Sequence, residues 1–185
     1  MSLFFIVPNR INEYIALNEF QLAENDYLFL LAENDKTPYF GIGDIYLGLA
    51  DLYSATKKYD LAIDYYKKAL SSNAMIDKYI IYLSYSKCLA ETKNYDEAIT
   101  NIDNGVASLG NEDPNRIQIN YYKSKNNVPA EYFLLMFQRA TIYFKAGKKK
   151  EGCNDLDEVL RLGEPETDIF KIQDRAVELR AKECK

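Results

Sequence analysis

The sequence predicts an all-α fold built from stacked helix hairpins, and two observations lead to that prediction. First, residues 49–70 and 85–106 align without a gap and share the pattern Thr-Lys-x-Tyr-Asp-x-Ala-Ile, which places Ala62 and Ala98 36 residues apart. Second, apolar side chains in each segment recur at three- and four-residue spacing, which indicates one apolar stripe on each of two helices. A hairpin this short cannot bury its stripes alone, so each repeat must stack on its neighbour.

Two further copies extend the repeat toward both ends of the chain. Residues 139–160 form a copy with Gly152 at the alanine position, and residues 10–31 form a weaker copy with Ala23 there. We therefore expect one domain over residues 1–185 with about four repeats, of which the first is degenerate. The expected boundaries are about 8–35, 38–73, 75–109 and 129–163 for the repeats, 111–127 for an insertion and 165–183 for a C-terminal capping helix.

Residue sizes and helix-end residues support these boundaries. Two helices that cross closely need small side chains at the crossing, and the four residues expected there are Ala23, Ala62, Ala98 and Gly152. Pro38 and Pro129 fall in the first turns of the second and fourth repeats, while Gly110 and Gly163 fall where second helices should end.

Three segments fall outside the repeats. The insertion at 111–127 is either a long loop or a short extra element, and a functional role and a mere excursion remain equally open. The tail after Pro165 has an apolar face that suits a helix covering the last repeat. The apolar run Leu3–Val7, closed by Pro8, is too short for a signal-peptide core or a membrane span.

The order of large and small residues in the second copy is set by Tyr46, Leu49, Ala50, Tyr53, Tyr59, Ala62, Tyr66 and Ala69. This order resembles the consensus of the tetratricopeptide repeat family, although Ala74 stands where the family usually has proline. The resemblance covers most of the chain. It implies a right-handed superhelical solenoid of antiparallel helix pairs, in which the first helix of each pair lines a concave groove that binds a protein or peptide.

The candidate partner-binding residues are those that the packing stripe leaves free on the first helices. They are Asp44, Leu47, Asp51 and Ser54 in the second copy, Ile80, Leu83, Ser84 and Lys87 in the third, and Leu134, Phe137, Gln138, Thr141 and Phe144 in the fourth. Leu47, Leu83 and Phe137 recur at the same place and predict an apolar line for hydrophobic anchors of a partner. The alternative is that these three pack against the insertion or the N-terminal run.

The residue inventory argues against an enzyme, a metal site and a cofactor site. The sequence has no histidine, which removes the usual activating base and the commonest metal ligand. A net charge of −5 and a pI of about 4.9 disfavour nucleic acid, and the lack of a long apolar stretch disfavours a membrane span.

The cysteines bear on where the protein works. Cys88, Cys153 and Cys184 are odd in number and lack the Cys-x-x-Cys spacing, so we expect buried or half-buried thiols in a cytoplasmic protein. A Cys153–Cys184 disulfide is the alternative, and it would suit an exported chain whose leader has been removed.

The expected function is a non-catalytic adaptor or scaffold for a protein or peptide with hydrophobic anchors. Family members that bind the C-terminal carboxylate of chaperones use paired cations on first helices. The matching sites here hold Leu47, Asp51, Ser84, Leu134 and Gln138, so that mode is not expected. A dedicated inhibitor, such as an immunity-type protein that sequesters a toxin or enzyme, is the alternative. Self-association into a homo-oligomer also remains open.

Overall fold

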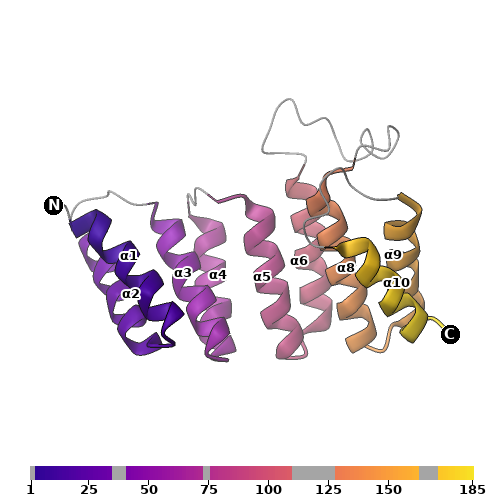
Figure 1. Cartoon of the computed structure of the whole chain (residues 1–185), viewed down its shortest axis with the longest axis horizontal. Coiled ribbons are helices and arrows are strands. Elements are labelled where there is room, and N and C mark those ends of the chain that lie inside the picture. Colours follow the sequence, from indigo (N-terminus) through magenta and orange to yellow (C-terminus); the bar gives the residue numbers. More distant parts are fainter. Residues whose placement is uncertain (1–2, 35–40, 73–75, 110–127, 163–170) are drawn as a thin grey trace. The chain divides into compact units, whose positions relative to one another are not determined.

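The structure is a computed structural model, and it describes residues 3–34, 41–72, 76–109, 128–162 and 171–185. Within these ranges the chain forms nine helices and no strand (Figure 1), which confirms the predicted all-α repeat fold. Contacts group the chain into two compact units, Met1–Asp77 and Lys78–Lys185. The predicted insertion at 111–127 lies outside the described residues.

The first unit holds two helix hairpins that stack on each other. Its helices are α1 (Leu3–Ala16), α2 (Phe20–Asn34), α3 (Ile42–Ala55) and α4 (Tyr59–Ser71). Helix α2 packs against α1 within its own hairpin and against α3 of the next one. The sequence predicts that the first repeat begins near residue 8, but α1 begins at Leu3 and contains Pro8. A proline inside a helix removes one backbone hydrogen bond, and burial of Val7 and Ile11 beside it offsets that loss.

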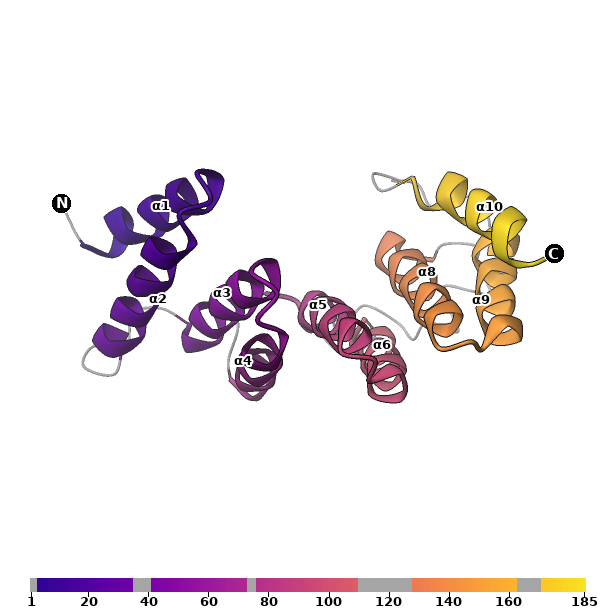
Figure 2. The ribbon, with the colours of Figure 1, turned by 90° about the horizontal axis from the view of Figure 1, so that it is seen from below.

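The second unit holds two stacked hairpins and a final helix. Its helices are α5 (Lys78–Glu91), α6 (Tyr95–Ser108), α8 (Ala130–Lys145), α9 (Lys149–Leu162) and α10 (Ile172–Glu183). Helix α8 packs against both α5 and α6, so the later hairpin stacks on the earlier one. Helix α10 lies beside α8 and α9 (Figure 2), where the sequence predicts a capping helix. The first part of that predicted helix, residues 165–170, lies outside the described ranges.

All four hairpins turn in the same way. In each turn one residue adopts the left-handed backbone with φ between 58° and 74°, and these residues are Asn18, Lys57, Lys93 and Gly147. The next amide then donates to a carbonyl five residues earlier, as from Lys58 to Tyr53 at 2.8 Å, and the same bond closes the other three turns. This is a Schellman helix ending. Because it recurs at aligned positions, the degenerate first copy is a genuine repeat.

The small residues predicted at the helix crossings are buried in all four repeats. Ala23, Ala62 and Ala98 are each 0% exposed, and Gly152 is also buried. A β-carbon at Gly152 would lie 2.8 Å from the ring of Phe144. The glycine therefore leaves room at this crossing for the aromatic ring of the facing helix.

In the first repeat a charged pair links the two helices of the hairpin, and a matching pair does the same in the fourth repeat. Two guanidinium nitrogens of Arg10 donate to the two carboxylate oxygens of Asp26 at 2.6 Å, and Arg139 donates to Asp155 in the same way at 2.8 and 2.7 Å. Arg139 also donates to Asp103 of α6 and so joins the fourth repeat to the third. Burial raises the pKa of Asp155, and the Arg139 hydrogen bonds oppose that shift.

We predict that Arg139→Leu destabilises the chain by about 3–5 kcal/mol, because it leaves the buried Asp155 carboxylate without its partner. The same change at Arg10 should cost less, since the Arg10 side chain is 43% exposed against 21% for Arg139. Urea unfolding followed by circular dichroism measures both losses. The double variant Arg139→Leu/Asp155→Leu should recover part of the stability. Equal losses for the two single variants would contradict this account.

A second prediction concerns the crossing of α8 and α9. Gly152→Ala should destabilise the wild-type chain by about 1–3 kcal/mol, because the new methyl group overlaps the Phe144 ring. In a Phe144→Leu background the overlap is relieved, and alanine's better helix propensity should make the same change stabilising by up to about 1 kcal/mol. Urea unfolding of the four proteins tests this reversal, and a loss of the same size in both backgrounds would refute the contact.

Candidate functional site

The three recurring apolar residues do not form an exposed line. Leu47, Leu83 and Phe137 are 4%, 7% and 8% exposed, so each is buried. The expectation that these three side chains form an exposed apolar line is therefore wrong. The physical reason is that first helices have several neighbours: α3 contacts α2 and α4, whereas α8 contacts α5, α6, α9 and α10. Such a helix buries a wider stripe than one hairpin requires.

The other predicted residues fall into different surroundings. Asp44 lines a small, mainly apolar cavity of about 180 Å³ between α1, α2 and α3. Asp51 accepts a hydrogen bond of 2.6 Å from the Tyr66 hydroxyl of α4, so its carboxylate takes part in the hairpin. Ser54, Ile80, Ser84 and Leu134 are half-buried and Lys87 is exposed. Phe144 lies against Gly152 of α9, where it fills the helix crossing instead of facing a partner.

Three of the predicted residues meet in one groove. Phe137, Gln138 and Thr141 of α8 form one wall, and α10 forms the other with Arg175, Glu178, Leu179 and Lys182. The groove has a volume of about 430 Å³, a size that admits part of a peptide. Its elements belong to a single unit, and α10 packs directly on α8.

The groove combines apolar lining side chains with charged ones. The Arg175 guanidinium carbon lies 4.5 Å from the centre of the Phe137 ring, a distance suited to a cation–π contact. The aliphatic side chain of Leu179 adds apolar surface, whereas Arg175 and Lys182 outnumber the one carboxylate, Glu178. The groove therefore suits a ligand that presents an apolar group beside a negative one.

Sequence reasoning missed the α10 wall of the groove. It treated 165–183 only as a cover for the last repeat. Residues 175, 178, 179 and 182 are nevertheless spaced three, four and seven apart, which places them on one helical face. That second stripe was a usable signal, but nothing in the sequence showed that it would lie along α8.

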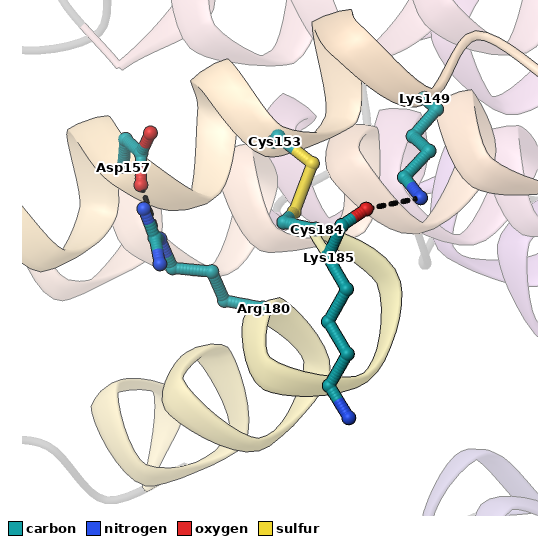
Figure 3. Close-up of a disulfide and its surroundings, with 6 residues drawn as sticks. All are labelled: Lys149, Cys153, Asp157, Arg180, Cys184 and Lys185. Atoms are coloured by element: carbon teal, nitrogen blue, oxygen red, sulfur yellow. Dashed lines mark hydrogen bonds and ion pairs between the residues drawn. A yellow bond between two sulfur atoms is a disulfide. The ribbon is translucent and has the colours of Figure 1, made fainter.

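A disulfide joins α10 to α9. Cys153 and Cys184 are bonded, with their Cα atoms 5.8 Å apart (Figure 3). This bond overturns the expectation of free thiols at these two positions and establishes the alternative pairing. The two residues lie 31 positions apart and meet only because α10 packs on α9. Cys88 is buried and takes no part in a disulfide, as expected.

No group of three or more His, Cys, Asp or Glu residues in the described ranges is placed to hold a metal ion. None of the described helices is both long enough and apolar enough to span a membrane.

Comparisons with known proteins agree on the repeat. A family model described as tetratricopeptide repeat matches residues 39–74, which correspond to the second repeat. No curated protein sequence matches the chain. Among solved structures, BtubC from P. vanneervenii is 14% identical with a TM-score of 0.69, and the match covers 95% of this chain and 79% of that one.

Two more solved structures share the fold. PilF of Pseudomonas aeruginosa is 17% identical with a TM-score of 0.63, covering 96% of this chain and 67% of its own. The first TPR of Spaghetti, solved with the HSP90 peptide SRMEEVD, is 17% identical with a TM-score of 0.51, covering 77% and 94%. The matched repeat model places a tetratricopeptide repeat at residues 39–74, and the four equivalent hairpins and this shared architecture show that the chain has a tetratricopeptide repeat fold.

Proposed function

We propose that this chain is a non-catalytic adaptor that holds a short segment of another protein in the groove between α8 and α10. The observation that carries the proposal is that Phe137 and Leu179 line the groove beside the cations Arg175 and Lys182. Both walls are helices, so the lining side chains sit on a rigid frame. A repeat fold whose relatives include a peptide complex supports this class of function.

The occupant we propose is an extended peptide with one apolar side chain next to an acidic one. The apolar group would contact Phe137 and Leu179, and the acid would lie near Arg175 and Lys182. The paired cations that bind a chaperone's terminal carboxylate are missing from the first helices, where Leu47, Asp51, Ser84, Leu134 and Gln138 stand. In this groove the cations come from α10, so we propose that an internal side chain is bound and not a chain terminus.

The disulfide bears on the location of the protein. Cytosolic reductants keep most thiols reduced, whereas exported proteins retain such bonds. We therefore propose that the chain works in an oxidising compartment, in place of the cytoplasmic location expected from the sequence. The Cys153–Cys184 bond is the observation that supports this change.

Peptides selected from a displayed library of random dodecamers test the adaptor proposal. We predict that selected peptides share an apolar residue near an acidic one. Arg175→Glu/Lys182→Glu should weaken their binding at least about tenfold, which corresponds to about 1.4 kcal/mol. Fluorescence anisotropy measures the affinity.

The matched control is Lys93→Glu/Lys150→Glu, which makes the same charge change at exposed positions outside the groove lining. It should leave binding nearly unchanged. Amidating the peptide's C-terminus should also have little effect, because the terminal carboxylate is not the proposed ligand. A library that yields no binder, or binders insensitive to the groove substitutions, would rule the adaptor proposal out.

A dedicated inhibitor of a basic protein is the second candidate, and one observation favours it. Residues 1–77 carry 11 acidic and six basic side chains, whereas residues 78–185 carry 17 of each. The net negative charge thus resides in the first unit, where it would attract a basic partner. Such a complex should weaken steeply with salt, and Arg175→Glu/Lys182→Glu should leave it intact or strengthen it.

A further inference from the structure

We propose that the Cys153–Cys184 disulfide completes the α8–α10 groove, so that only the oxidised chain binds a peptide there. This inference rests on the function proposed for the groove, and it adds that the redox state of the disulfide controls peptide binding there. The groove needs both of its walls, and the two halves of α10 are held to the rest of the unit by different means.

The first half of α10 is held by burial. Ile172 and Ala176 are buried against the unit. The Gln173 amide donates to the backbone carbonyl of Val159 in α9 at 2.9 Å, and this contact is also buried. These contacts do not involve sulfur, so they remain when the disulfide is reduced.

The second half of α10 is held mainly by contacts at its end. Val177, Glu178, Arg180 and Lys182 are exposed, and Leu179 is only half-buried. Figure 3 shows three interactions at this end of the helix. Arg180 forms an ion pair with Asp157, and Cys184 is bonded to Cys153. The Lys149 ammonium donates to the Lys185 backbone carbonyl at 3.0 Å. Exposed ion pairs contribute little to stability. The covalent bond is therefore the main constraint on this half.

The second half also supplies most of the groove wall. Three of the four lining residues of α10 are Glu178, Leu179 and Lys182, which follow the last fully buried residue, Ala176. Arg175 alone lies in the part fixed by burial. If the end of the helix frays, the groove loses its aliphatic contact and one of its two cations.

The chemistry of release is a two-electron exchange. A dithiol such as dithiothreitol attacks the Cys153–Cys184 bond through one thiolate, and its second thiol then displaces the remaining protein sulfur. The reductant becomes a cyclic disulfide, and Cys153 and Cys184 each become a thiol. Cys153 and Cys184 are half-buried, whereas Cys88 is 1% exposed and takes no part in this exchange.

Hydrogen exchange followed by mass spectrometry on the full chain tests whether the disulfide holds the second half of α10. On reduction with dithiothreitol, amide exchange over residues 177–184 should accelerate at least about tenfold, while residues 172–176 should change much less. Cys153→Ser/Cys184→Ser should reproduce the fast exchange and show no further response to dithiothreitol. Arg180→Ala/Asp157→Ala, with the disulfide intact, should keep the slow exchange.

Peptide binding is measured on the same samples with the library-selected dodecamers. Reduction should weaken their affinity at least about tenfold, and reoxidation should restore it. Unchanged amide exchange over residues 177–184 after reduction would overturn the claim that the disulfide holds the second half of α10. Equal peptide affinity in the oxidised and reduced states would overturn the claim that the disulfide controls binding. If the oxidised chain binds no peptide, the function proposed for the groove fails. The exchange result then still shows by itself whether the disulfide holds the second half of α10.

Discussion

A stack of helix hairpins ends at a hairpin that has no successor to cover its apolar face. In the second unit α10 takes the successor's place, since it packs on both α8 and α9. Ile172 and Ala176 are buried by this packing. One face of α10 thereby protects the last repeat, and the adjoining stripe faces α8 across an open groove. The need to cap the stack thus creates the surface on which the proposed function depends.

The same constraint explains how the repeats tolerate different sequences. Each hairpin keeps a left-handed residue in its turn, a small residue at its crossing and a bond between its two helices. The interhelical bond varies in chemistry: Arg–Asp pairs serve the first and fourth repeats, whereas Tyr66 donates to Asp51 in the second and Tyr85 donates to Glu97 in the third. The geometry of the hairpin is retained while the atoms that hold it change.

Sequence patterns predicted the features that are set by residues close together in the sequence. The shared pattern around Ala62 and Ala98 was enough to predict the repeat and its hairpins, and the apolar face of the tail after Pro165 was enough to predict the capping helix. The groove was not predictable in the same way, because Arg175 and Lys182 join Phe137 only through the packing of α10 on α8. The disulfide and the burial of Leu47 and Leu83 depend likewise on tertiary neighbours. The shared 16-residue spacing of Arg10–Asp26 and Arg139–Asp155 could have been noticed in the alignment.

The placement of α10 along α8 is the claim on which the groove, its charge and its redox dependence all rest. Proton chemical shifts of the Arg175 side chain measure it directly, because the guanidinium lies over the Phe137 ring. We predict that the ring current of Phe137 shifts the Arg175 side-chain protons upfield and that Phe137→Leu abolishes the shift. Arg175 signals at the positions of an unstructured peptide, unaffected by that substitution, would contradict it.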